Sequence, residues 1–113
     1  MEKNEWTSQL RRGVLEYSIL QLINKKSMYG YDLLESLNKW EILSTTEGTM
    51  YPLLRRLEKD NLIVSTWKES NPGVPPRKYY NLTDQGERFL KIMDDQWDNL
   101  ISALSDIKNS KED

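Results

Sequence analysis

The chain has 113 residues, a formal net charge of −2, and neither cysteine nor histidine. The length fits one domain with a modest core, and the missing residue types exclude disulfides, thiolate or imidazole metal sites and the commonest general base. The most apolar stretch, residues 18–23, is far too short to cross a bilayer, and no signal-peptide pattern is seen, so we expect a cytoplasmic protein without metal or other cofactor.

Charge is distributed unevenly along the chain. Residues 1–82 hold 12 Lys and Arg against 10 Asp and Glu, whereas residues 83–113 hold 4 against 8. The negative total therefore argues only weakly against a nucleic-acid partner, because binding of a polyanion depends on the local field at the contact surface.

Two helices are predicted in the first forty residues. Apolar residues occupy most of the circumference of a helix over residues 10–23, which is typical of a helix buried on more than one side. The sequence KKSMYG interrupts it, and helical spacing resumes over residues 31–40 through three leucines.

The third predicted helix, residues 45–59, contains a proline. Ser44, Thr45 and Thr46 are candidate caps at its start. Proline inside a helix removes a backbone donor and clashes with the preceding turn, so Pro52 indicates a role other than helix stability. We expect it to face outward and to bend the helix about its buried stripe. Four apolar residues at i, i+3, i+4 and i+7 form that stripe: Met50, Leu53, Leu54 and Leu57.

A β-hairpin follows. Residues 62–69 (LIVSTWKE) are rich in β-branched and aromatic residues, and residues 77–82 (RKYYNL) form the returning strand. Pro72 and Gly73 suit the centre of a type II turn at the tip.

A long amphipathic helix is predicted from the cap residue Thr83 to about Ile107. Three short helices and a hairpin leave little core to cover its apolar stripe, so we expect a second copy of the chain to cover it in a homodimer. The predicted dimer interface comprises Leu10, Val14, Phe89, Met93, Trp97, Leu100 and Leu104.

Three helices followed by a hairpin are the order of a winged helix-turn-helix, a mainly α fold with a small β part whose third helix enters the major groove. Residues 1–82 would form the DNA-binding domain and residues 83–113 a long C-terminal dimerisation helix. With the apolar stripe inward, the outward face carries small residues first and cations later, which suits base edges and then phosphates. Its members are Thr45, Gly48, Pro52, Arg55 and Lys59, with Thr49, Tyr51 and Arg56 at its sides.

The hairpin offers a second contact through Lys68, Arg77 and Lys78, which bracket its proline-stiffened tip. For a single lysine such as Lys59 or Lys68, an ordinary solvated charge is an equally good interpretation. The outward face as a set favours DNA.

Three stretches resemble the signature sequences of the PadR-type transcriptional regulators, in order and at the usual spacing: YGYDLL (residues 29–34), EGTMYPLLRRLEKDNLI (residues 47–63) and RKYYNLTDQG (residues 77–86). The length is similar to the short branch, with a single C-terminal helix. The resemblance implies dimeric winged-helix repressors that release DNA when a small molecule binds. Met50 and Asn61 depart from the commoner leucine and glycine, but methionine fills the same core position and asparagine tolerates a left-handed helix end.

The same resemblance implies DNA contacts from Thr49, Tyr51 and Arg55. It also implies contacts from Arg77 and Lys78 on the wing, which is the hairpin of residues 62–82. Tyr29 would touch a phosphate, or alternatively stack between the first two helices. Tyr31, Tyr79 and Tyr80 are interpreted as packing residues with a polar tip. The complete predicted DNA-binding set is Tyr29, Thr45, Thr46, Thr49, Tyr51, Arg55, Lys59, Lys68, Arg77 and Lys78.

Trp97 resembles the central tryptophan of multidrug-sensing (LmrR-like) members, in which two copies sandwich flat aromatic drugs at the dimer centre. Carboxylates of Glu16, Asp94 and Asp98 would favour cationic ligands. The alternative is that Trp97 is simple interface packing.

Other functions stay open to different degrees. An enzyme is disfavoured, because the chain lacks histidine, cysteine and a glycine-rich phosphate loop. A winged helix that binds protein, and a constitutive repressor without a ligand, are the alternatives to a ligand-released repressor. The expected partner is a palindromic double-stranded operator with half-sites about one turn, roughly 34 Å, apart.

Overall fold

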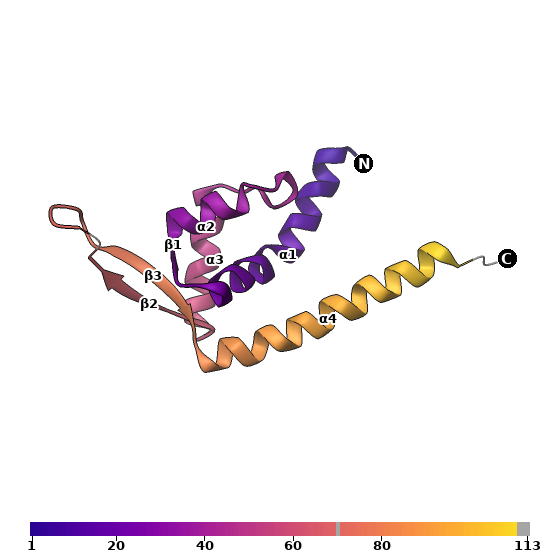
Figure 1. The fold of residues 1–113 in the computed structure, drawn as a ribbon. Coiled ribbons are helices and arrows are strands. Elements are labelled where there is room, and N and C mark those ends of the chain that lie inside the picture. Colours follow the sequence, from indigo (N-terminus) through magenta and orange to yellow (C-terminus); the bar gives the residue numbers. More distant parts are fainter. Residues whose placement is uncertain (70, 111–113) are drawn as a thin grey trace.

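The computed structural model describes residues 1–69 and 71–110. Figure 1 shows the helices before the hairpin gathered together, the hairpin projecting at one end, and a long helix that runs toward the end where both termini lie. The described elements are α1 (Lys3–Lys25), β1 (Met28–Tyr29), α2 (Gly30–Leu37), the 3-10 helix η1 (Glu41–Leu43), α3 (Glu47–Lys59), β2 (Ile63–Lys68), β3 (Arg77–Leu82) and α4 (Asp84–Asn109). The predicted fold class is confirmed: a mainly helical winged helix with a small antiparallel sheet and a C-terminal helix.

The core lies between α1, α2, α3 and the inner face of the sheet. The stripe predicted on α3 is confirmed, because Met50, Leu54 and Leu57 are fully buried and Leu53 packs against the core at its edge. From α1 and α2, Leu15, Ile19, Leu20, Ile23, Leu33 and Leu37 complete the helical side of the core. Burial of these apolar side chains is the main force that holds the helices together.

Helix α3 continues through Pro52, which is exposed. Proline donates no backbone hydrogen bond, so the Gly48 carbonyl one turn earlier has no partner within the helix. Gly48 is also exposed, and water can reach that carbonyl. At the start of the helix Thr46 occupies the cap position without a side-chain capping bond. Its carbonyl accepts from the Met50 amide at 2.9 Å and from the Thr49 amide at 3.2 Å.

The sheet has the strand order β1-β3-β2, and both pairs are antiparallel. Thr66 pairs with Tyr79, and Lys68 with Arg77. Two backbone features at the ends of the hairpin and of α3 agree with the predictions. Gly73 has φ +83°, as a type II turn requires, and Asn61 ends α3 with φ +62°.

The start of α4 is built into the core. Thr83 caps the helix as predicted: its hydroxyl accepts from the Gly86 amide at 2.9 Å and donates to the Asn61 carbonyl at 2.7 Å. Gly86 lies directly against the Leu62 carbonyl group, and Leu90 is buried. The first turns of α4 are therefore part of the winged-helix core, and only the later turns project from it (Figure 1). Residues 111–113 of the predicted dimerisation segment lie outside the described residues.

The boundaries differ most from the predictions in the first two helices. Helix α1 begins at Lys3, well before its apolar pattern, and the second helix ends at Leu37 instead of continuing to Trp40, so that a turn and η1 follow. Across the described ranges, none of the helices combines the length and apolar character needed to span a membrane.

Candidate nucleic-acid interface

The outward face of α3 is exposed as the spacing predicts. Gly48, Pro52, Arg55 and Lys59 are all accessible to solvent, and so is Thr49 beside them. Arg55 and Lys59 form no ion pair within the described part of the chain. The outward face of α3 therefore has small side chains in its first turns and, in its later turns, two cations without an ion-pair partner among the described residues.

One flank of α3 packs on α2. Tyr51, predicted as a DNA contact, is only partly exposed, and its ring and hydroxyl lie against Gly30, where an added Cβ would come 2.7 Å from the nearest ring carbon. Burial, and then the nearby Glu47 carboxylate, raise the pKa of Tyr51 above its ordinary value. Tyr51 therefore joins α3 to the start of α2, a packing role that the sequence did not reveal.

On the same flank Glu58 connects α3 to the wing. Its carboxylate accepts from the Ser65 hydroxyl at 3.0 Å and pairs with the Lys78 ammonium at 3.3 Å. Lys78 is predicted to contact DNA from the wing, and the structure shows that Glu58 partly neutralises its charge within the protein. Lys68 and Arg77 are exposed and make no such pair in the described residues.

The two exposed wing cations rest on aromatic rings. The Arg77 guanidinium lies 4.6 Å from the ring centre of Tyr29, and the Lys68 ammonium 5.2 Å from that of Tyr79. The centre of the Tyr29 ring lies 5.5 Å from that of Tyr79 and 6.2 Å from that of Tyr31. The alternative in which Tyr29 stacks between the first two helices is not what the structure has, since its ring lies on the sheet beside the wing. Rings beneath the cations attract them and hold them near one surface.

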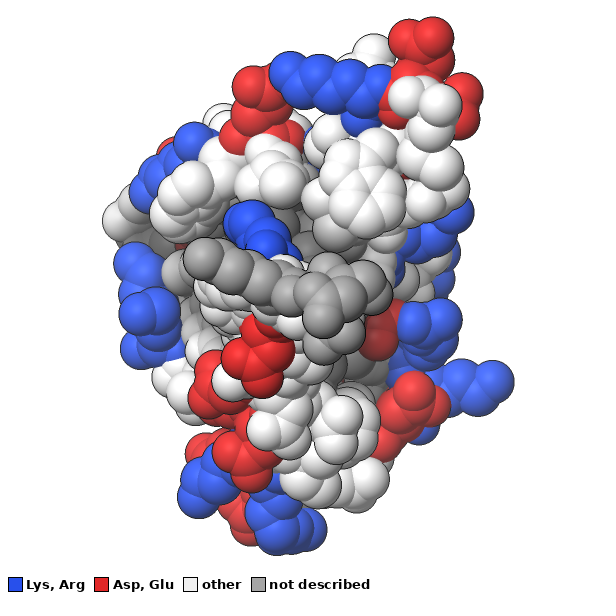
Figure 2. Space-filling model, turned by 90° about the vertical axis from the view of Figure 1, so that its right-hand side faces the viewer, with Lys and Arg blue, Asp and Glu red and all other residues white. Residues whose placement is uncertain are grey.

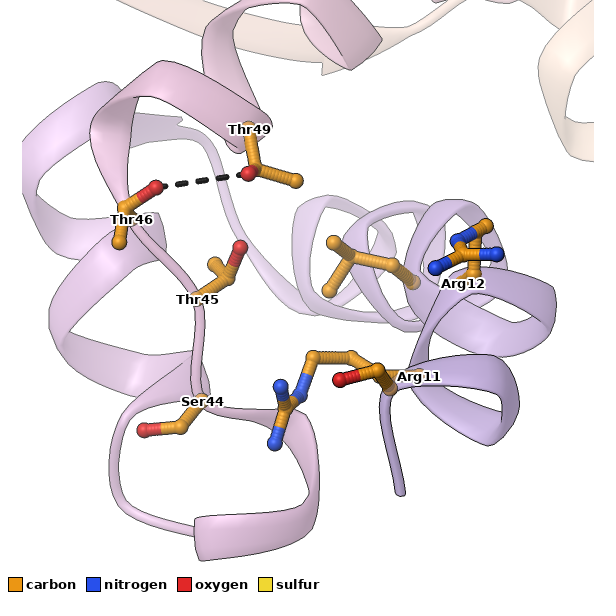
Figure 3. Close-up of a pocket in the computed structure, with 8 residues that line it drawn as sticks. Arg11, Arg12, Ser44, Thr45, Thr46 and Thr49 are labelled. Carbon is orange, nitrogen blue, oxygen red and sulfur yellow. Dashed lines mark hydrogen bonds between the residues drawn. The ribbon is translucent and has the colours of Figure 1, made fainter. Parts of the chain in front are cut away.

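The other flank of α3 faces α1. Arg56 forms an ion pair with Glu16 of α1, and a pocket of about 280 Å³ opens near the start of α3. Figure 3 shows Thr45, Thr46 and Thr49 on one side of it and Arg11 and Arg12 on the other. The two arginines are absent from the predicted DNA-binding set, although two adjacent cations in the sequence are a recognisable sign of a basic surface.

The predicted dimer residues line one apolar groove of about 650 Å³ between α1 and α4. Trp97 lies in this groove, 6.0 Å from the Tyr17 ring. The groove includes all seven predicted interface residues: Leu10, Val14, Phe89, Met93, Trp97, Leu100 and Leu104. Met93 is half-buried by its own chain, whereas Leu100 and Leu104 are about half exposed, at 49% and 51%.

The carboxylates predicted around Trp97 are those of Glu16, Asp94 and Asp98, and Asp94 and Glu16 have different partners. Asp94 accepts hydrogen bonds from the Tyr17 hydroxyl at 2.5 Å and the Gln21 amide at 2.6 Å. Burial and this bond to Asp94 raise the pKa of Tyr17, and Asp98 adds to the effect. Glu16, predicted beside them, is paired with Arg56 on α3.

The end of the molecule away from the wing carries mixed charges. Figure 2 shows basic and acidic side chains interspersed with uncharged surface on this face. Such a mixture provides no single-sign field for a polyanion, in contrast to the free cations of α3 and the wing.

The chain matches the family model for the transcriptional regulator PadR-like family over residues 19–92. Among solved structures it is similar to a PadR-like transcriptional regulator of Bacillus cereus, with 38% identity, coverage of 91% of this chain and 99% of that chain, and a TM-score of 0.82. It is also similar to a PadR-like transcription factor of Bacteroides fragilis, with 43% identity, coverage of 91% and 98%, and a TM-score of 0.73. A relative from Lysinibacillus sphaericus, described as an uncharacterized protein, is 33% identical over 80% of this chain and 84% of its own length.

Regulators of the PadR family bind DNA, generally as dimers, and are not enzymes. The match extends from the last third of α1 through the first third of α4 and includes all of α3 and the wing. The protein is a transcriptional regulator of the PadR-like family.

Proposed function

We propose that the protein is a homodimeric, sequence-specific repressor that inserts α3 into the major groove of a palindromic operator. The observation that carries this proposal is the exposed outward face of α3, with small residues at its start and, further along, the cations Arg55 and Lys59, which form no ion pair with any described residue. Small residues permit close approach to base edges, and the cations meet phosphates or guanines. Lys68 and Arg77 on the wing add a backbone contact at the flank.

Selection of oligonucleotides by the purified protein tests this function. The expected product is a palindrome with half-sites about one helical turn apart. Affinity for that operator should fall steeply as salt rises, with a logarithmic slope near −0.9 for each phosphate contact. Failure to enrich any sequence, together with a shallow salt response, would favour a protein-binding winged helix.

The homodimer is supported by the apolar face of α4. The later turns of this 26-residue helix expose Leu100, Ile101, Leu104 and Ile107. Covering these apolar side chains with a second copy of the chain would lower the free energy, because it removes apolar surface from water. Sedimentation equilibrium should give twice the 13.4 kDa mass of the chain. Replacing Leu104 by Glu should shift the protein toward monomer, whereas Asp106→Asn, a charge change two residues away, should not.

Release by a flat aromatic ligand is supported by Trp97 and by the volume of the groove beside it. Indole and phenol rings at 6.0 Å offer stacking surfaces. A ligand held between the two copies would change the spacing of the two α3 helices and so weaken operator binding. Planar cationic dyes should quench wild-type tryptophan fluorescence and reduce operator affinity, and Trp97→Ala should remove both effects while Trp6→Ala leaves them intact. If saturating dyes leave operator affinity unchanged, release by such ligands is wrong and a constitutive repressor is favoured.

A further inference from the structure

Helix α3 lies between two cationic elements. On one flank Glu58 contacts Ser65 and Lys78 of the wing. On the other flank Arg56 pairs with Glu16 of α1, and Thr49 faces the pocket whose other wall is α1. Apart from Arg56, the cations predicted at the flanks of α3 all lie on the wing.

The pocket on the α1 side has the chemistry of an oxyanion site. Its lining consists of side chains that donate hydrogen bonds, together with one leucine, and includes no carboxylate: Ser8, Arg11, Arg12, Leu15, Ser44, Thr45, Thr46 and Thr49. Its volume of about 280 Å³ is ample for a phosphate group. Figure 3 shows the threonine side chains and the two arginines around the same space.

The two arginines differ in how they are held. Arg11 donates from Nε to the Ile42 carbonyl and from Nη2 to the Glu41 carbonyl, both at 3.1 Å, so its guanidinium is fixed in place. No carboxylate of the described residues pairs with its charge. Arg12 is exposed and makes no hydrogen bond or ion pair within the described ranges. Arg11 thus shapes the pocket, and Arg12 supplies a free charge beside it.

We propose that this pocket binds one phosphate of the DNA backbone, on the side of the major groove opposite the wing contact. The inference rests on the proposed DNA-binding function. The major groove is about 12 Å wide and is bordered by a phosphate backbone on each side, so a helix inside it has phosphates at both flanks. The wing cations meet one backbone, and Arg12 with the Thr45 and Thr49 hydroxyls meets the other.

Arg12→Gln is the test variant, because among the residues the structure describes Arg12 has no partner whose loss would unfold the protein. Arg88→Gln is the matched control, since Arg88 is an exposed arginine on α4 outside the pocket and the substitution changes net charge equally. We expect Arg12→Gln to weaken operator binding roughly three- to tenfold and to reduce the magnitude of the salt slope by about one. The loss should be the same for operator and random DNA, because phosphate contacts carry no sequence information. Arg88→Gln should change neither quantity.

A duplex with single methylphosphonate substitutions locates the contact. Neutralising the phosphate held by the pocket should weaken wild-type binding but have no further effect on Arg12→Gln, whereas other positions should affect both proteins equally. Replacing chloride with inorganic phosphate at equal ionic strength shows whether the pocket binds a phosphate of the DNA backbone or free phosphate. Arg12-dependent binding of free phosphate that leaves DNA affinity untouched would overturn the assignment to DNA.

The outcomes also separate this inference from the proposed function. If the wild-type protein selects no DNA, the function itself fails. If it binds an operator and Arg55→Gln weakens it, but Arg12→Gln behaves like Arg88→Gln, only the phosphate pocket is wrong.

Discussion

The guanidinium carbon of Arg77 lies 4.6 Å from the centre of the Tyr29 ring. This contact joins the first residue of β3, on the wing, to the residue before α2. Tyr29 is itself paired with Tyr79 in the sheet. The position of an exposed wing cation is thus set by a ring on a separate element, and less side-chain freedom remains to be lost when DNA binds.

Two substitutions of Tyr29 distinguish positioning from direct contact. If the ring positions Arg77, Tyr29→Phe should keep operator affinity within about twofold, and Tyr29→Ala should reduce it roughly three- to tenfold. If the hydroxyl touches a phosphate, as the family resemblance implies, Tyr29→Phe should already show the loss. Fluorescence anisotropy on a labelled operator measures all three proteins under one buffer condition.

The Tyr17–Asp94 hydrogen bond predicts a dependence of stability on pH. Burial and Asp94 raise the pKa of Tyr17 above 10.0, so its contribution to stability is complete below pH 10 and is lost as pH rises through the folded-state value. Tyr17→Phe should lower the free energy of unfolding near pH 7 by about 1 kcal/mol and make the alkaline decline shallower. Urea titrations at pH 7 to 11 check this. An alkaline decline as steep as in wild type would contradict the assignment.

Gly86 should tolerate no side chain. An added Cβ would lie 2.9 Å from the Leu62 carbonyl carbon and closer still to its oxygen, and backbone cannot move aside as a flexible side chain can. Gly86→Ala should therefore destabilise the protein by about 2 kcal/mol or more, despite the higher helix propensity of alanine. Thermal denaturation followed by circular dichroism measures the change, and an unchanged midpoint would show that the start of α4 is not packed as described.

Gly48 is the contrasting position. The nearest atom to an added Cβ is the Thr46 hydroxyl at 3.8 Å, so Gly48→Ala should leave the free protein equally stable or slightly more stable. The same methyl group lies on the face proposed to approach base edges, and we expect it to weaken operator binding about tenfold. Equal affinity of Gly48→Ala and wild type would place the DNA elsewhere.

Local rules of sequence account for much of the fold. The helical spacing of Met50, Leu54 and Leu57 predicted their burial, and Thr83 followed by Gly86 formed the expected cap. These features depend on residues close together in the chain, where backbone geometry fixes their relation. Strand β1 escaped prediction because two residues carry no periodicity, and the strand exists only through its pairing with β3.

The site was predicted less completely than the fold. The exposure of Arg55 and Lys59 follows from one helix and was foreseen. The pairing of Lys78 with Glu58, the packing of Tyr51 on Gly30, and the pairing of Glu16 with Arg56 each join elements distant in sequence. No spacing rule relates such residues, so their charges and rings were assigned to partners outside the protein.

The measurement that tests the account most directly compares operator affinity of the wild-type protein with that of a variant carrying Arg55→Gln and Arg77→Gln together. Each cation lost should cost about 1 kcal/mol or more, so the double variant should bind the operator at least about thirtyfold more weakly while its thermal midpoint stays near that of wild type. A dissociation constant equal to that of the wild-type protein would contradict the placement of DNA against α3 and the wing.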